Sequence, residues 1–292
     1  MNGQQHKTRG AGAAPLALSL LAVLSGAAAA AAGPVPLPGA RAVVIMGQSN
    51  ALGQAALEAG DTTPLAAVQA IRRDGRPRDS AEPIGGAGYG FGRAFAEAYL
   101  AAHPLTPELW IVQCAVSGSL VSDWKANRDA YDVCRVMIHE AQALGVEIMA
   151  VLWHQGESNA KSTAAAQGYQ AALEAVVLQM RQEVLPLAEG PSQLSRSPHL
   201  PAAGLPFIAG ELGRFLDPTA YPARAAVVNQ TRQAMTKDFS RAFVDSLGLT
   251  DKGDNLHFDH ASQDLLGARY ETALEAILGC GGGLGGSLPV CE

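Results

Sequence analysis

The stretch Ala-Val-Val-Ile-Met-Gly-Gln-Ser-Asn, residues 42–50, joins a continuous apolar run to an abrupt polar ending. Residues 42–46 offer no polar side chain to solvent, which is typical of a strand covered on both faces. Such strands form parallel sheets, and these sheets bind ligands at the carboxyl ends of their strands. The polar residues that follow, 47–50, are therefore expected at a functional edge.

Four further short apolar runs repeat this pattern, and longer segments with apolar residues at helical spacing lie between and after the five runs. The strand candidates are residues 42–46, 109–114, 148–154, 205–209 and 242–245. The helix candidates are residues 91–102, 131–144, 164–184, 223–238 and 261–278. Alternating strands and helices predict an α/β fold with a five-stranded parallel sheet flanked by helices.

Length and charge limit the organisation and the partners. A chain of 292 residues that is 48% hydrophobic can bury one large core, and we expect one main domain over residues 41–278. The formal net charge is −6. Without a run of Lys or Arg beyond the N-terminus, the composition argues against binding to nucleic acid or anionic lipid.

The N-terminal segment has the order of a secretory signal. Lys7 and Arg9 precede an apolar stretch at residues 13–24 and small residues at 27–32. This predicts a signal peptide over residues 1–32, a linker over 33–40 and a secreted mature chain that begins near Gly33. The alternatives are an organelle-targeting peptide and a membrane anchor, for which the apolar stretch is short against roughly 30 Å of hydrocarbon.

The four cysteines matter because secreted proteins form disulfides. Cys280 and Cys291 bracket a Gly-rich segment of the predicted tail, residues 279–292, and a disulfide between them is favoured. For Cys114 and Cys134, a disulfide and two free buried thiols are both open. Asn229 begins a glycosylation triplet, but it falls within a predicted helix.

A serine, a histidine and an aspartate suggest acyl-transfer chemistry. Ser49 follows the first predicted strand, and Asp254 precedes His257 by three residues in a predicted turn. A serine hydroxyl needs a neighbouring base, and a histidine can act as that base when an acid orients its ring. The alternatives are an N-cap role for Ser49 and His260 as the base, although His260 lacks an acid three residues before it.

Two more polar loops follow predicted strands and could stabilise the negative charge that develops on the carbonyl oxygen. Gly118 would offer a backbone N–H and Gln155 a side-chain NH₂, alongside the backbone N–H of Ser49. Each preorganised donor contributes roughly 3 to 4 kcal/mol to the transition state. We therefore predict an oxyanion site formed by these three residues.

A metal-dependent hydrolase is the competing chemistry, with His154, Glu157, His257 and Asp259 as conceivable ligands. His154 and Glu157 are three residues apart, but on a strand-to-loop segment rather than one helix face, and no further spacing completes a site. We predict neither a metal nor another cofactor. The Gly-x-Ser-x-Gly elbow of other serine hydrolases is not found around Ser117.

Three ordered segments carry a family resemblance. They are Gly47-Gln48-Ser49-Asn50, Trp153-His154-Gln155-Gly156-Glu157, and Asp254-Asn255-Leu256-His257 followed by Gly267-Ala268-Arg269-Tyr270. Together they resemble the signature blocks of the sialate O-acetylesterase-like proteins, which include carbohydrate esterase family six and belong to the SGNH hydrolase superfamily. The resemblance spans residues 43–278.

The resemblance implies a three-layer α/β/α fold of flavodoxin-like type. It places the catalytic triad on Ser49, His257 and Asp254, and the oxyanion donors on the Ser49 and Gly118 backbones and the Gln155 side chain. Gln48 stands where the wider superfamily has Asp, and Gln155 where it has Asn, as in this subfamily. Supporting roles fall on Gln48, Asn50 and Glu157, with Glu157 buttressing the Gln155 loop and a direct acid–base role as the alternative.

The expected function is that of a secreted serine esterase. It would remove O-acetyl groups from a carbohydrate such as acetylxylan or a sialic-acid-like sugar, through an acyl-enzyme on Ser49. The alternative is a secreted carbohydrate-binding protein that keeps this fold without catalysis. Turnover of an acetyl ester separates the two.

Overall fold

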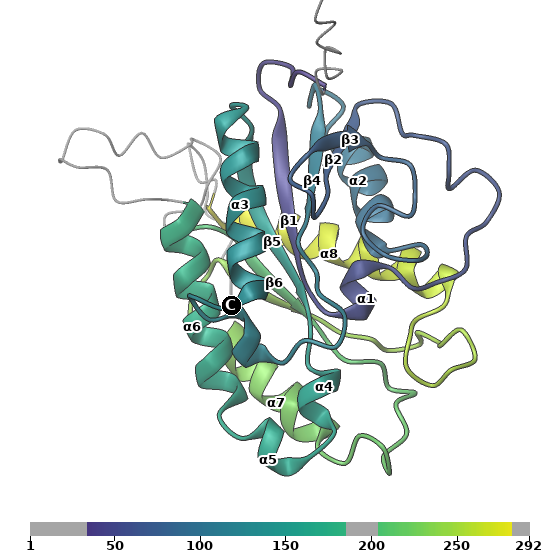
Figure 1. Ribbon diagram of the computed structural model, residues 1–292, viewed down its shortest axis with the longest axis vertical. Coiled ribbons are helices and arrows are strands. Elements are labelled where there is room, and N and C mark those ends of the chain that lie inside the picture. The colour runs from purple at the N-terminus through teal and green to yellow at the C-terminus, as the bar shows by residue number, and fades with distance from the viewer. Residues whose placement is uncertain (1–33, 185–203, 282–292) are drawn as a thin grey trace, which may run out of the picture. The chain divides into compact units, whose positions relative to one another are not determined.

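The structure is a computed structural model that describes residues 34–184 and 204–281 (Figure 1). The predicted signal peptide lies outside the described residues, as do the predicted Cys280–Cys291 disulfide and most of the tail. Within the described ranges, none of the helices has the length and apolar character that a membrane span requires.

A seven-stranded sheet forms the centre of the part of the chain that the structure describes. Its strands follow the order β3-β2-β4-β1-β5-β6-β7. All neighbouring strands are parallel except β3, which is antiparallel to β2. The strands are β1 (Arg41–Gly47), β2 (Val68–Ile71), β3 (Pro77–Asp79), β4 (Leu109–Gln113), β5 (Glu147–His154), β6 (Phe207–Gly210) and β7 (Arg241–Val244).

The prediction of an α/β fold with a parallel sheet is confirmed except at the antiparallel strand β3, and the count of five strands is wrong because β2 and β3 were missed. The four residues of β2 include Gln69 and carry no long apolar run. The edge strand β3 begins with Pro77 and continues with two charged residues. Proline and charge are features that edge strands use against unwanted pairing, and they conceal a strand from a search for apolar runs.

One layer of helices covers each face of the sheet. Successive residues of β1 point to opposite faces and therefore contact different layers. Val43 and Ile45 pack with residues of α2 and α8, whereas Val44 and Met46 pack with residues of α3, α6 and α7. In Figure 1, α3 lies in front of the sheet and α8 behind it. These helices are α2 (Phe91–Ala102), α3 (Asp129–Ala143), α6 (Tyr169–Val184), α7 (Arg224–Met235) and α8 (His260–Gly281).

The predicted helix over residues 164–184 is two helices. A short helix, α5 (Thr163–Ala166), ends before Gly168, and α6 begins at Tyr169. Gly168 has a φ of +68°, a left-handed conformation that interrupts an α-helix. Helical spacing alone does not detect such a break, because the apolar residues stay in phase across it.

The central strand β1 lies between β4 and β5 and marks the point where the strand order reverses. The segments after these three strands meet at one edge: Val116 N donates to Gly47 O at 2.8 Å, and Gln48 N donates to His154 O at 2.9 Å. Gly47 has a φ of +130°, and a Cβ there would lie 2.0 Å from the His154 carbonyl oxygen. Only glycine allows the ends of β1 and β5 to come this close.

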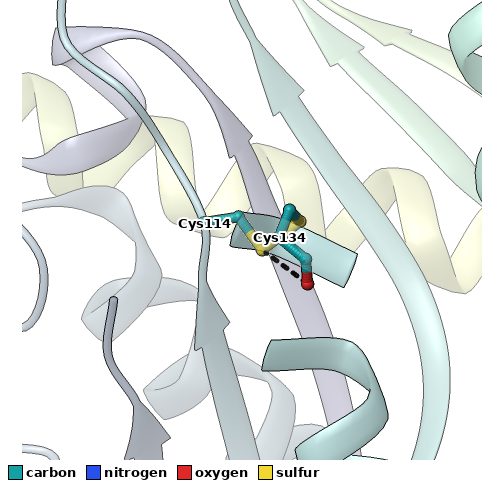
Figure 2. The surroundings of a disulfide bond; sticks show 2 residues. All are labelled: Cys114 and Cys134. Carbon is teal, nitrogen blue, oxygen red and sulfur yellow. Dashed lines mark hydrogen bonds between the residues drawn. A yellow bond between two sulfur atoms is a disulfide. The ribbon is translucent and has the colours of Figure 1, made fainter. Parts of the chain in front are cut away.

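A disulfide ties this edge to the helical layer. Cys114, directly after β4, is bonded to Cys134 of α3, with their Cα atoms 4.9 Å apart (Figure 2). Both residues are buried. Of the two possibilities for this pair, the structure has the disulfide, and it anchors the start of the loop that carries Gly118.

Candidate active site

Ser49 begins the short helix α1 (Ser49–Leu52), at the carboxyl end of β1 (Figure 1). The cap of this helix is Gln48, so the alternative role of Ser49 as an N-cap is not observed. The Ser49 side chain instead lies 3.0 Å from His257, measured from Oγ to Nε2. Only 5% of the residue is exposed. A buried serine hydroxyl therefore faces a histidine from the far end of the chain.

His257 and Asp254 lie in residues 251–259, the base loop. The ring Nδ1 of His257 lies 2.7 Å from Asp254 Oδ2. The other carboxylate oxygen accepts from the backbone N–H groups of His257 at 2.8 Å and Leu256 at 3.0 Å. These bonds fix the carboxylate against the ring, so Nδ1 carries the proton and Nε2 is free to accept from Ser49.

Hydrogen bonds stabilise the negative charge of the Asp254 carboxylate. Partial burial by itself raises the pKa of the carboxyl, but the hydrogen bonds from the His257 backbone, the His257 ring and the Leu256 N–H outweigh it and lower the pKa below its usual value. The carboxylate therefore stays ionised at neutral pH, in the state that can orient a histidine and stabilise its protonated form.

His260, the alternative base, contacts different partners. Its ring stacks on Tyr89 with the centroids 3.9 Å apart, and its Nε2 lies 3.1 Å from Asp61 Oδ2. Asp259 binds the Thr250 hydroxyl at 2.5 Å. The acid–histidine pair that meets Ser49 is therefore the pair with the three-residue spacing.

The loop after β4 presents Gly118 with a φ of +73°, a conformation that suits glycine. Its carbonyl accepts from the Ser158 hydroxyl at 2.9 Å, which joins this loop to the segment after β5. Among the described residues, the backbone N–H groups of Gly118 and Ser49 have no hydrogen-bond acceptor. Both remain available to a substrate oxygen.

Gln155 is buried at the end of β5, and its NH₂ group is already engaged. It donates to Ser119 O at 2.8 Å and to Asn159 Oδ1 at 2.9 Å. A carboxamide has two N–H donors, so both are used within the protein in this conformation. The oxyanion role of Gln155 stays a prediction, and it requires one of these bonds to be exchanged for the substrate.

Gln48 holds the segment after β5 in place. Its side-chain oxygen accepts from Ser158 N at 3.2 Å and from Gly156 N at 3.4 Å, and it lies 3.3 Å from Gln155 Nε2. Two backbone donors of one segment thus converge on one carbonyl oxygen. The contact pattern fits the supporting role that was predicted for Gln48.

Glu157 begins the short helix α4 (Glu157–Ala160) and is 1% exposed. Its Oε1 accepts from Asn50 Nδ2 at 2.6 Å, a contact to the segment after β1 rather than to the Gln155 loop that was predicted. Burial raises the pKa of Glu157 to about 7 and lowers that of His154 to about 4. Between these values both side chains are uncharged, with Glu157 Oε1 3.8 Å from His154 Nε2.

The four residues considered as metal ligands do not converge. His154 and Glu157 are buried behind the site, His257 contacts Ser49 and Asp254, and Asp259 contacts Thr250. Within residues 34–184 and 204–281, no three His, Cys, Asp or Glu side chains are arranged to hold a metal ion.

A family model described as "Carbohydrate esterase, sialic acid-specific acetylesterase" matches residues 40–276. The chain belongs to this family of carbohydrate esterases. The membership confirms the resemblance inferred from the three sequence segments, and it makes the protein a carboxylic ester hydrolase.

Relatives of this carbohydrate esterase are distant in sequence. A probable carbohydrate esterase of Arabidopsis thaliana is 24% identical over 254 residues, which cover 80% of this chain and 89% of the relative. An X-ray structure of an Arabidopsis thaliana protein matches with a TM-score of 0.66 and 22% identity, over 82% of this chain and 99% of that one. A carbohydrate acetylesterase from Xanthomonas citri matches with a TM-score of 0.57 and 18% identity, over 82% of this chain and 56% of that one. These structures share its fold.

The family segment at residues 267–270 supports the site from behind. A Cβ on Gly267 would lie 2.6 Å from the Phe91 carbonyl oxygen, so glycine permits the close packing of α8 on α2. Tyr270 donates its hydroxyl to Trp153 O at 2.7 Å, beneath the end of β5. The segment therefore fixes the position of the helix that follows the base loop.

Several contact residues were missed from the sequence. Ser119, Ser158 and Asn159 link the loop after β4 to the segment after β5. The signal that could have found two of them is the run of polar residues from 154 to 159 directly after a buried strand, because buried polar groups require partners.

Proposed function

We propose that this carbohydrate esterase removes O-acetyl groups from a sugar through a triad of Ser49, His257 and Asp254. The observation that carries the proposal is the continuous contact from Ser49 Oγ to His257 Nε2, at 3.0 Å, and from His257 Nδ1 to Asp254, at 2.7 Å. Nucleophile, base and orienting acid are thus within hydrogen-bond reach in the order that acyl transfer needs.

In the first half of the reaction, Ser49 Oγ attacks the acetyl carbonyl carbon while its proton passes to His257 Nε2. Negative charge develops on the former carbonyl oxygen, where the free N–H groups of Ser49 and Gly118 can donate to it. The bond between the carbonyl carbon and the sugar oxygen then breaks. That oxygen takes the proton from His257 and leaves an acetyl group on Ser49.

In the second half, a water molecule attacks the acetyl-serine carbonyl and gives its proton to His257 Nε2. The bond to Ser49 breaks, the proton returns to Oγ and acetate leaves. Throughout, Asp254 accepts from Nδ1 and stabilises the protonated ring, so its low pKa matches its task.

A polar cavity supports a carbohydrate as the substrate. The cavity, of about 400 Å³, adjoins Gly118, and the side chains around it include Ser117, Asp123, Asn127, Arg128 and Asp129. Hydroxyl, carboxylate, amide and guanidinium groups together can donate to and accept from sugar hydroxyls. This lining favours a polar leaving group over an apolar one.

Replacing Ser49 tests the mechanism. Ser49→Ala should abolish release of acetate from 4-nitrophenyl acetate and from acetylated sugars, and it should end labelling by a fluorophosphonate, while far-UV circular dichroism stays unchanged. Ser122→Ala, on the 3₁₀ turn Val121–Trp124, is the matched serine control and should keep wild-type turnover. Wild-type turnover in Ser49→Ala would overturn the triad.

The substrate is decided by comparing kcat/KM for acetylated xylan with that for an O-acetylated sialic acid. A preference of tenfold or more assigns the sugar class. Equal low values on both, beside efficient hydrolysis of small aryl esters, would contradict a carbohydrate substrate.

Secretion is also part of the proposal. The N-terminal sequence pattern supports it, and so does the Cys114–Cys134 disulfide, because disulfides persist in oxidising compartments. N-terminal sequencing of the exported protein should give a start near Gly33. An intact Met1 on the exported protein would contradict the predicted cleavage.

A further inference from the structure

The base loop needs an anchor, because its catalytic contacts are mainly internal. The bonds between Asp254 and His257 join residues three apart, so they fix the pair internally but not relative to Ser49. The Asp254 side chain is 37% exposed, so burial does little to hold it. Lys252 reaches Gln54 O at 2.8 Å, but from an exposed position. The buried Phe258 ring packs on His154 and Phe215 and holds the end of the loop in the core. Directed polar contacts would in addition fix the loop backbone relative to Ser49.

Asn50 provides contacts of this kind on both sides of His257. Its Nδ2 donates to Leu256 O at 3.1 Å, and its Oδ1 accepts from Phe258 N at 3.1 Å. Asn50 is 0% exposed and directly follows Ser49 in the chain. The residue after the nucleophile therefore holds the two backbone groups that flank the base.

Glu157 acts with Leu256 O and the Phe258 N–H to fix the direction in which the Asn50 carboxamide points. The second N–H of Asn50 Nδ2 donates to Glu157 Oε1 at 2.6 Å, so both N–H groups and the oxygen of the carboxamide are in use. If the carboxamide were reversed, its oxygen would face the Glu157 oxygen and its NH₂ would face the Phe258 N–H. Acceptor would then face acceptor and donor would face donor in a buried site, which is strongly unfavourable.

The surroundings of the second oxygen of Glu157 favour the uncharged carboxyl, and an uncharged carboxyl can still accept from Asn50. Glu157 Oε2 is buried and has no hydrogen-bond partner among the described residues. An ionised carboxylate is costly to bury in this way, and burial raises the pKa to about 7. The neutral carboxyl still offers Oε1 as an acceptor to Asn50, and a Gln at position 157 would offer the same acceptor in the same volume.

We propose that Asn50 is a positioning residue for His257, and that Glu157 acts through Asn50 as the acceptor that fixes its orientation. Together they form a buried clamp between the nucleophile segment and the base loop. The clamp rests on the proposed triad. It sets the distance from Ser49 Oγ to His257 Nε2, and a displacement of about 1 Å at such a contact lowers the rate about 100-fold.

Two substitutions at position 157 separate the clamp from direct acid–base catalysis. Glu157→Gln keeps the acceptor and should retain kcat on 4-nitrophenyl acetate within about threefold. Glu157→Met removes the acceptor and should lower kcat about 100-fold with KM nearly unchanged. Fluorophosphonate labelling of Ser49 should slow in parallel. Glu82→Gln, at a second buried glutamate that accepts from the Ile84 N–H, is the control and should leave kcat unchanged.

The outcomes are distinct. If Glu157→Gln loses as much kcat as Glu157→Met, the carboxyl acts by its charge or its proton, and the clamp is overturned. Wild-type kcat in Glu157→Met also overturns it. If Glu157→Met does not fold, Asn50→Asp replaces it: this isosteric change puts an acceptor against Glu157 and Leu256 O, and should lower kcat about 100-fold without changing KM. Wild-type kcat in Asn50→Asp overturns the clamp.

Failure of the clamp and failure of the triad give different results. An inactive Ser49→Ala enzyme beside a fully active Glu157→Met enzyme rejects the clamp alone. An active Ser49→Ala enzyme rejects the triad, and the clamp with it.

Discussion

The base loop and the buried polar cluster, defined as Gln48, Asn50, His154, Gln155 and Glu157, meet at Asn50 beside Ser49 and are held in different ways. In the base loop, Asp254 binds residues two and three positions away. In the cluster, Asn50 binds Glu157 across 107 residues, and Gln48 binds Ser158 across 110. The Asp254 contacts are local in the sequence, whereas the contacts of the cluster join segments that only the folded chain brings together.

This difference separates chemistry from support. In the base loop, the side chains of Asp254 and His257 are partly exposed, and Asp254 is ionised, as the proposed proton transfer requires. Side chains in the cluster are buried, and two of them have pKa values shifted toward their neutral forms. Substitutions in the loop should therefore change turnover, whereas substitutions behind it should change stability or geometry.

The largest expected effect is on turnover. Asp254→Asn leaves the size of the side chain unchanged but lets its amide donate toward the ring, which favours the wrong tautomer of His257. We expect kcat to fall about 10⁴-fold with little change in the thermal midpoint. Asp79→Asn, the same exchange at an exposed position of the edge strand β3, is the control and should keep kcat within about threefold. A loss below tenfold in Asp254→Asn would break the assignment of roles to the loop.

A single methyl group tests the close approach of β1 and β5. Gly47→Ala puts a Cβ 2.0 Å from the His154 carbonyl oxygen at a φ of +130°. We expect about 3 to 5 kcal/mol of lost stability in urea unfolding, or insoluble protein. Gly60→Ala has a φ of +101° with nothing within 4 Å of the new Cβ, and should cost only about 1 kcal/mol. Equal losses in the two variants would mean that backbone conformation, and not the contact, decides.

The disulfide should contribute to stability more than to chemistry. Cys114 and Cys134 are separated by 20 residues, and closing a loop of this size stabilises a fold by about 3 kcal/mol through the unfolded chain. The double variant Cys114→Ala/Cys134→Ala should lose about this much in urea unfolding and keep its KM. A large rise in KM would show that the bond shapes the loop of Gly118 directly.

The smallest expected effect is a dependence on pH. Because the folded protein holds the proton of Glu157 up to a pKa of about 7, against 4.5 for the unfolded group, wild-type stability falls as pH rises from about 4.5 to 7 and then levels. The Glu157→Gln variant has no carboxyl at this position, so its stability does not show this fall with pH. Its stability relative to wild type should therefore increase by roughly 2 to 3 kcal/mol between pH 4 and pH 8.

The pKa of His154, about 4 in the fold against 6.5 for the free group, gives the opposite slope between these values. It is present in both proteins, so it cancels in the comparison. A difference between the two unfolding curves that does not vary with pH would contradict a raised pKa at Glu157.

The sequence predicts the parts of this molecule that are local. The five apolar strands and the helices between them follow from hydrophobic spacing, and the pairing of Asp254 with His257 follows from a three-residue offset in a turn. The strands β2 and β3 were missed, because a short strand that contains Gln69 and an edge strand that begins with Pro77 do not show the apolar signal of a buried strand.

Long-range contacts explain what the sequence does not predict at the site. Nothing near Glu157 in the chain indicates that it binds Asn50 rather than the Gln155 loop, since that bond depends on how β1 and β5 are aligned. Likewise, the hydrogen bonds from Gln155 to Ser119 and Asn159 join side chains that only the sheet brings together. The residue types of Glu157 and Gln155 predicted that both belong to the site, but not which residues they bind.

The distance along the chain between Ser49 and His257 has a consequence for synthesis. The two residues are 208 positions apart, and the base loop directly precedes α8. A nascent chain that already contains Ser49 therefore lacks the proposed base until residue 257 has been added. Fragments that end before residue 257 carry the proposed nucleophile without its proton acceptor, so we expect them to be inactive.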